Sequence, residues 1–188
     1  DCEQRVQFAL DLADRFEAAL IGVAGLPLRT AFAAGGVVLY REPTQEDYGT
    51  TTARFEKMGQ KFCIQGQALK SVEWRTALEP PDEVIVREAR AADVILVGPT
   101  RSGRNVRDLV EPGVILLRAG RPVLVVPDVI GPLPLRRVVV ACKDARECRR
   151  AVSDALPFLR EANEVLVVEI GEEDTKSEDK RNLADIRR

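Results

Sequence analysis

The sequence predicts an α/β fold with a doubly wound parallel sheet, followed by the start of a second copy of the same fold. Three observations support this. Apolar runs of strand length alternate with segments of helical periodicity, turn residues separate them, and two stretches repeat one order of elements. With 45% hydrophobic residues among 188, the chain can bury a substantial core.

The expected elements of the first copy alternate between helix and strand. Helical periodicity is clear over residues 4–17, 45–69, 81–92 and 112–120, and strands are expected at residues 20–25, 71–77, 93–98 and 122–127. Prolines suit the first turns of the third and fourth helices, and Gly120 can end the fourth in a left-handed conformation. Residues 27–43 are too apolar for a solvated loop and too glycine-rich for a helix, so we expect an irregular segment beside the crevice at the strand ends.

A proline-rich stretch divides the chain. We expect a first domain over residues 1–127, a stiff linker over residues 128–136 and the start of a second domain over residues 137–188. The second copy should contain strands at its start and near residues 164–170, with a helix between them from about Arg146 to Glu161 that Pro157 kinks or shortens.

The internal repeat matches residues 5–26 to residues 149–170, helix to helix and strand to strand. In the second copy a strand precedes this helix, whereas the first copy opens on the helix itself. We therefore expect the first strand of copy one, and most of copy two, to lie outside this sequence. A strand upstream of Asp1, the segment Arg137–Cys142, or that segment of another subunit could fill the resulting gap, and the first is favoured.

Composition narrows the function classes. The 28 basic and 30 acidic side chains give no field that favours nucleic acid or an anionic membrane, and no apolar run is long enough to cross a bilayer. Because neither a signal peptide nor a CxxC motif is present, we expect a cytoplasmic protein with reduced thiols. A redox pair of Cys142 and Cys148 is the less favoured alternative. The absence of histidine removes the usual zinc sites and catalytic pairs, and we expect no metal and no enzyme.

The candidate site is the loop over residues 98–113, because ligands of parallel sheets bind beyond the carboxyl ends of the strands. Backbone, hydroxyl and guanidinium groups of this loop could bind phosphate, and its candidate residues are Gly98, Thr100, Arg101, Ser102, Gly103, Arg104, Arg107 and Gly113. The alternative, a solvated loop with arginines paired to carboxylates, is the favoured interpretation. Trp74 is expected to pack against the sheet rather than to stack on a base.

The chain resembles the universal stress protein family in its tandem, two-domain form, whose fold is Rossmann-like. The resemblance rests on the order of elements, on DVILVG before the glycine loop, on LLRAGRPVLVVP, and on the second start VVVACKDARECRRAVSDAL. It implies a loop of the form G-x-x-G, nine residues, then G-[ST] that binds ATP. Here Arg101 replaces the second glycine and Glu111-Pro112 replaces the final pair, so ATP binding is expected to be lost.

In the second copy Lys143 stands where the resemblance implies an aspartate, and Asp144 follows it. This pair is a candidate for the nucleotide crevice, although capping of the next helix is the favoured role. The leading hypothesis is a non-enzymatic stress-response protein that acts through assembly or protein partners. The resemblance implies a homodimer or an intramolecular pseudo-dimer through residues 122–127, with Val123 to Val126 at the contact. The alternatives are an ATP or anion sensor using the loop over residues 98–113 and a distant relative that adenylates a substrate.

Overall fold

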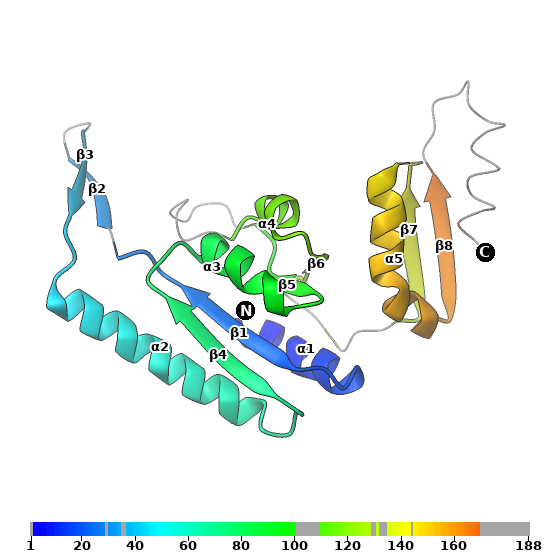
Figure 1. Cartoon of the computed structure of the whole chain (residues 1–188), viewed down its shortest axis with the longest axis horizontal. Helices are drawn as coiled ribbons and strands as arrows, with labels where there is room; N and C mark the ends of the chain where they lie inside the picture. The colour runs from blue at the N-terminus through cyan, green and yellow to red at the C-terminus, as the bar shows by residue number, and fades with distance from the viewer. Residues whose placement is uncertain are drawn as a thin grey trace. The chain divides into compact units, whose positions relative to one another are not determined.

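The computed structural model describes residues 2–28, 30–34, 37–100, 110–128, 131, 135–143 and 145–169. The chain divides into two compact units, Asp1–Pro132 and Leu133–Arg188, and the boundary falls inside the segment expected to be a linker. Both units are mixed α/β (Figure 1). Within the described residues no helix is both long and apolar enough to cross a membrane.

The first unit contains the elements α1 (Cys2–Arg15), β1 (Leu20–Gly25), β2 (Thr30–Ala34), β3 (Val37–Arg41), α2 (Gln45–Gln65), β4 (Val72–Ala77), α3 (Pro81–Glu88), a 3-10 turn η1 (Ala89–Ala91), β5 (Ile95–Val97), α4 (Pro112–Ala119) and β6 (Val123–Val125). Strand β1 pairs in parallel with β4, from Leu20 opposite Val72 to Gly25 opposite Ala77. Strand β5 pairs in parallel with β6, from Ile95 opposite Val123. The four strands predicted from the sequence are confirmed, and each belongs to a parallel pair, but over the described residues the structure shows two separate two-stranded sheets and not the single doubly wound sheet that was expected.

Helices cover both faces of the β1–β4 pair. A Cβ added to Gly22 would contact Trp74 and Phe62 of α2, whereas a Cβ added to Gly25 would contact Val84 of α3. Residues three apart in a strand point to opposite faces, so α2 and α3 pack on opposite sides of β1. Figure 1 shows the same arrangement. The carboxyl end of β1 is therefore enclosed by α3 on one face.

A second part of the core surrounds α4. Ile115 is fully buried and packs with Ala89, Ile95 and Val97. Helix α4 begins with Pro112 in its first turn and ends at Gly120, whose φ of 62° is left-handed, as the sequence predicted. These contacts hold the start of α4 near the end of β5, where the candidate loop begins.

The expectation of an irregular segment over residues 27–43 is wrong. Strands β2 and β3 form an antiparallel hairpin with Ala34 opposite Val37. The sequence between these two paired residues is Gly-Gly, which is typical of a two-residue hairpin connection and was the missed signal. The next element, α2, begins with a capping box in which Thr44 Oγ1 accepts from the Asp47 amide and the Thr44 amide donates to the Asp47 carboxylate.

The second unit contains β7 (Arg137–Cys142), α5 (Arg146–Glu161) and β8 (Glu164–Glu169). Strands β7 and β8 are parallel neighbours, from Arg137 opposite Glu164 to Cys142 opposite Glu169. Helix α5 has the bounds expected from the sequence, and because it continues past Pro157 to Glu161, this proline does not end it early. Exposed and more buried side chains alternate along β7, whereas the first half of β8 is exposed. Val139 and Leu166, which lie opposite each other, are both exposed.

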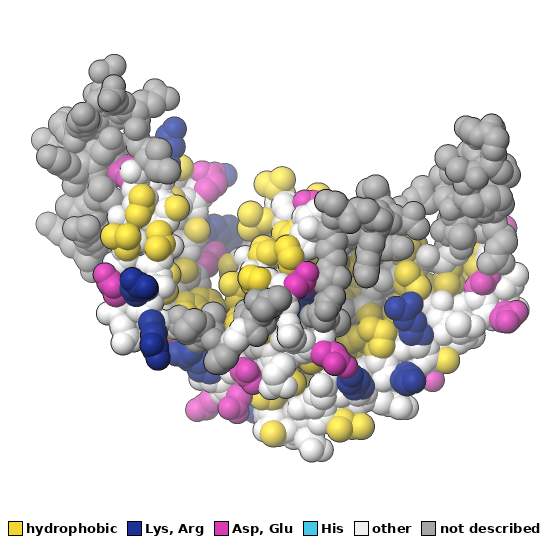
Figure 2. Space-filling view, turned by 180° about the vertical axis from the view of Figure 1, so that it is seen from behind, with side chains coloured by type: hydrophobic (Ala, Val, Ile, Leu, Met, Phe, Trp, Pro, Cys, Tyr) yellow, Lys and Arg dark blue, Asp and Glu magenta, His cyan; other side chains and the backbone are white. Residues whose placement is uncertain are grey.

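Several large hydrophobic side chains of the first unit are also exposed. Four of them lie on α4 and on the neighbouring strand β6, namely Val114, Leu116, Leu117 and Val125. Tyr48, Met58 and Ile64 lie on α2, and Leu78 follows β4. Figure 2 shows exposed hydrophobic side chains beside both acidic and basic side chains. An exposed apolar group on an edge strand is a potential contact surface.

Candidate functional site

The end of β5 forms one wall of the candidate site. Gly98 follows this strand, and a Cβ at Gly98 would overlap the guanidinium of Arg5. Arg5 comes from α1, and its Nη2 donates to Asp128 Oδ1 over 3.2 Å. A side chain at position 98 would therefore displace the arginine, and the glycine lets a positive charge lie directly against the strand end.

The Nε atom of Arg5 is buried and has no hydrogen-bond partner among the described residues. A buried donor on a charged group costs free energy unless it is satisfied. Arg5 and Asp128 were not identified from the sequence, because 123 positions separate them and no local pattern relates them. Only the packing of α1 against the sheet brings them together.

The start of α4 carries a carboxylate. The Thr100 hydroxyl donates to Glu111 Oε1 over 3.1 Å, which joins the two ends of the loop. Glu111 is the N-cap residue of α4, and Pro112 follows it without an amide N–H. A Cβ added at Gly113 would meet no atom of the described residues within 4 Å. A phosphate approaching this helix N-terminus would meet the negative charge of Glu111. Arg101, Ser102, Gly103, Arg104 and Arg107 lie outside the described residues.

The two candidate residues of the second unit lie between β7 and α5. Lys143 is exposed after the end of β7, and Asp144 lies outside the described residues. Helix α5 has Ala145 as its N-cap residue, and the side chain of Ala145 makes no capping bond. The capping role expected of the Lys143–Asp144 pair depends on Asp144 and stays a prediction. The candidate residues thus occur in two separate units, and no common crevice can be described for them.

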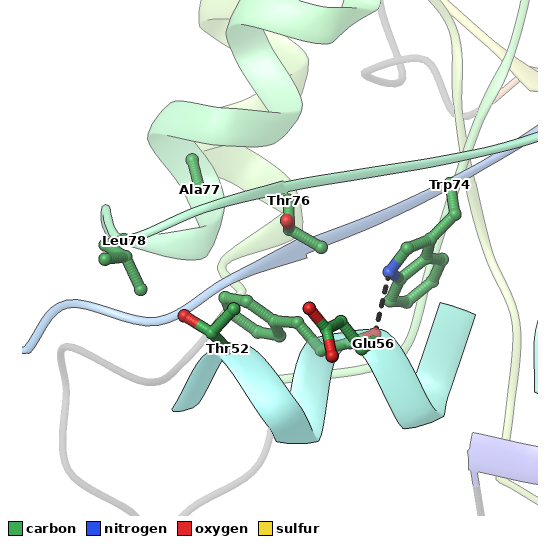
Figure 3. Close-up of a pocket in the computed structure, with 7 residues that line it drawn as sticks. Thr52, Glu56, Trp74, Thr76, Ala77 and Leu78 are labelled. Carbon is green, nitrogen blue, oxygen red and sulfur yellow. Dashed lines mark hydrogen bonds between the residues drawn. The ribbon is translucent and has the colours of Figure 1, made fainter. Parts of the chain in front are cut away.

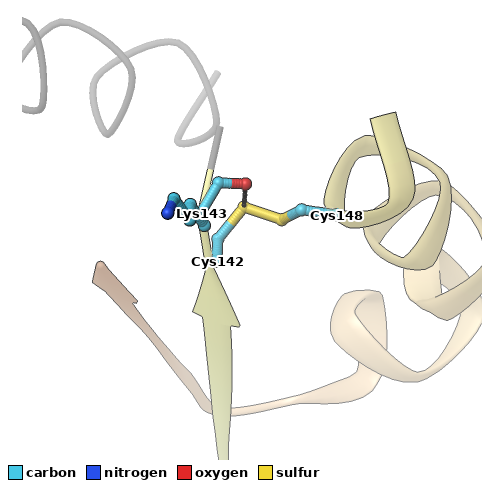
Figure 4. The surroundings of a disulfide bond; sticks show 3 residues. All are labelled: Cys142, Lys143 and Cys148. Carbon is cyan, nitrogen blue, oxygen red and sulfur yellow. Dashed lines mark hydrogen bonds between the residues drawn. A yellow bond between two sulfur atoms is a disulfide. The ribbon is translucent and has the colours of Figure 1, made fainter. Parts of the chain in front are cut away.

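The cysteines next to Lys143 differ from the expectation. Cys142 and Cys148 form a disulfide with a Cα–Cα distance of 5.6 Å, as Figure 4 shows. The prediction of reduced thiols is therefore wrong for this pair, because the strand end and the first helical turn bring two cysteines six positions apart within bonding reach. Cys63 of α2 is a free, exposed thiol.

Ion pairs across the first unit lower the pKa of two glutamates of α3. Arg118 of α4 donates both Nη atoms to Glu83 of α3, at 2.8 and 2.7 Å, and these bonds lower the pKa of Glu83. The bond from Arg75, at 2.9 Å, is the main cause that lowers the pKa of Glu88. Both carboxylates are paired with arginines that hold elements together, so these shifts indicate structural ion pairs rather than an acid/base pair.

A pocket of about 290 Å³ lies between α2 and β4 (Figure 3). Its lining consists of Thr52, Phe55, Glu56, Trp74, Thr76, Ala77 and Leu78, none of which was predicted as a site residue. The indole Nε1 donates to the Phe55 carbonyl over 3.1 Å, so its N–H is already satisfied. Because this lining offers no basic group and only one carboxylate, it can supply neither an anion site nor an acid/base pair. Packing of Trp74 against α2 and β1 agrees with the structural role expected for it.

Among the described residues no group of three or more potential metal ligands comes together. The site that the geometry assembles is thus a guanidinium at the end of β5, with a hydroxyl–carboxylate bond at the start of α4. Comparison of the chain with protein-family models, with curated proteins and with solved structures gives no match.

Proposed function

We propose that this chain is a non-enzymatic regulatory protein, similar to universal stress proteins, that acts by assembling through the edge of β6 and the adjoining face of α4. The observation that carries the proposal is the exposure of Leu117 and Val125, at 86% and 45%, on a helix and an edge strand that contact each other. Apolar side chains beside an open strand edge favour pairing with another strand.

The arrangement of the strands supports the fold part of this proposal. The pairs β1–β4 and β5–β6 are both parallel, and α3 connects them while packing on β1 and on α4. In a doubly wound sheet the order would be β4, β1, a central strand, β5 and β6. The central position corresponds to the first strand of the resembled fold, and β6 is then an outer strand.

The site chemistry supports the non-enzymatic part. Glu111 places a negative charge at the start of α4, Pro112 removes a donor, and the Thr100 hydroxyl is already bonded. These features oppose the binding of ATP phosphates at this position. We propose that the first domain functions without ATP and that its surface, rather than a bound nucleotide, is recognised by its partner.

Light scattering tests the assembly. Val126 is buried and its amide donates to the Val97 carbonyl, so a change at Val126 would disturb the fold. Val125 is exposed and is therefore the residue of the predicted contact to change. If the edge pairs between two chains, we expect the parent protein to be a dimer and Val125→Lys to have the mass of one 20.8 kDa chain. If the edge pairs within one chain, we expect Val125→Lys to have a lower melting temperature than the parent protein. Ile64→Lys, on an exposed part of α2, is the matched control and should leave both values unchanged. An unchanged mass and melting temperature for Val125→Lys would mean that this edge pairs with nothing.

A second candidate, an anion sensor, is favoured by Arg5 alone. Its guanidinium lies against Gly98 and retains an unbonded Nε among the described residues. Calorimetric titration with ATP and Mg²⁺, and separately with inorganic phosphate, distinguishes this candidate from the first. Binding tighter than about 100 µM that Arg5→Gln abolishes and Arg90→Gln preserves would replace the assembly proposal with the sensor.

A further inference from the structure

Cys142 and Cys148 occupy the two ends of one short connection in the second unit. Cys142 is the last residue of β7, where it lies opposite Glu169 of β8, and Cys148 is in the first turn of α5. Regular structure thus fixes the backbone of both cysteines, and their Cα atoms are 5.6 Å apart, inside the range that a disulfide spans. We propose that this pair is a reversible thiol–disulfide exchange site for low-molecular-weight disulfides such as glutathione disulfide.

The two sulfurs differ in accessibility. Cys142 is 7% exposed, whereas Cys148 is partly exposed. Cys142 Sγ also lies 3.7 Å from the Lys143 carbonyl oxygen, to which a reduced Cys142 thiol can donate (Figure 4). A disulfide in solution therefore reaches Cys148 first, and Cys142 is the cysteine that later resolves the intermediate.

The surroundings of Cys148 favour a negatively charged sulfur. Cys148 is the third residue of a sixteen-residue helix whose N-cap, Ala145, contributes no side-chain bond to the first-turn amides. These amides and the positive end of the helix stabilise a thiolate. Residues 143–150 carry four basic and two acidic side chains, and Arg146 and Arg150 are paired with Glu147 and Asp154. Cys63 is the natural contrast, because it lies in the last turn of α2, where the helix dipole opposes a thiolate.

The reaction has two balanced steps. The Cys148 thiol first ionises, and its thiolate attacks one sulfur of the small disulfide, so that a mixed disulfide forms. One small thiolate leaves and takes up from solvent the proton that Cys148 released. Cys142 then attacks the Cys148 sulfur, its proton passes to the departing second small thiolate, and the Cys142–Cys148 bond forms. The protein loses two electrons, and the small disulfide, which is the oxidant, is reduced to two small thiols.

The experiment uses the full chain with Cys2→Ser and Cys63→Ser, so that only the pair remains. The reduced protein is exposed to glutathione disulfide, quenched with acid and weighed intact. We expect the loss of two hydrogens, reversed by reduced glutathione. With Cys142→Ser added, one glutathione should stay attached to Cys148, and it should attach roughly tenfold faster than to Cys142 in the Cys148→Ser protein.

A second measurement uses the chain with both Cys142 and Cys148 intact, so that it tests the proposal even if the cysteine variants misfold. In the reduced parent chain, brief alkylation followed by peptide mapping should label Cys148 before Cys63. Equal or faster labelling of Cys63, attachment at Cys142 as fast as at Cys148, or a bond that glutathione neither forms nor reduces would each overturn the proposal.

Discussion

The contact between α2 and β4 gives the sharpest prediction. The same substitution, glycine to alanine, at two positions of α2 should change the free energy of unfolding in opposite directions. An alanine Cβ at Gly59 would lie 2.8 and 2.9 Å from Nε1 and Cγ of Trp74. A Cβ at Gly49, earlier in the same helix, would meet no atom of the described residues within 4 Å. Trp74 cannot easily move away, since its indole is bonded to the Phe55 carbonyl and its ring packs on Phe62 with centroids 5.4 Å apart.

The magnitudes follow from two opposing terms. Replacing a helical glycine by alanine increases the free energy of unfolding by about 0.5–1 kcal/mol, because the unfolded chain loses freedom. Forcing a methyl group into a filled space costs about 1–3 kcal/mol. We therefore expect Gly49→Ala to stabilise the first unit by about 0.5–1 kcal/mol, and Gly59→Ala to destabilise it by about 0.5–2 kcal/mol.

The assay is urea unfolding followed by tryptophan fluorescence. The chain contains one tryptophan, so its fluorescence reports on the first unit alone. The two variants should show unchanged slopes and midpoints on opposite sides of that of the parent. If Gly59→Ala is as stable as Gly49→Ala, then the indole does not press against α2 and the packing argument is refuted.

Three further outcomes are expected. In urea unfolding, Ile115→Ala should lower the free energy of unfolding by about 2–5 kcal/mol, whereas Leu117→Ala should change it by less than about 0.5 kcal/mol. Similar losses for the two variants would contradict the assigned burial of these side chains. Because the folded-state pKa of Glu88 is lowered, its stabilising effect is present above about pH 4.3 and is lost as the pH falls through the folded value. Glu88→Gln should accordingly lower the free energy of unfolding at pH 7 but not in acid. A loss of the same size at both pH values would rule out this linkage. Reduction of the Cys142–Cys148 disulfide should destabilise the second unit by about 2 kcal/mol in thermal melts followed by circular dichroism. The unfolding transition of the first unit, followed by tryptophan fluorescence, should stay unchanged. A shift of the tryptophan transition alone would contradict the placement of this disulfide in the second unit.

Much of the local structure could be predicted from the sequence, because its causes are local. The apolar run at residues 20–25 predicted β1 at its observed bounds, and the proline and glycine around α4 predicted its start and its left-handed end. The Gly-Gly between β2 and β3 carried a hairpin signal of the same local kind, although the irregular flanking pattern obscured it. The bounds expected for α5, Arg146 to Glu161, are also those observed, and Pro157 lies within the helix without ending it early.

The candidate site depended on contacts between distant parts of the chain. Gly98 and Thr100 were chosen from sequence, but the charge against Gly98 comes from Arg5, and the Thr100 hydroxyl is occupied by Glu111. No periodicity or spacing relates such residues, since their proximity results from the packing of α1 and α4 against the strands. The Cys142–Cys148 bond lies between these cases: the spacing is local, but only the meeting of a strand end with a helical turn brings the two sulfurs within bonding distance. Sequence alone thus determined which elements form, because backbone preference and apolar periodicity act over a few residues, whereas tertiary packing decided which side chains meet.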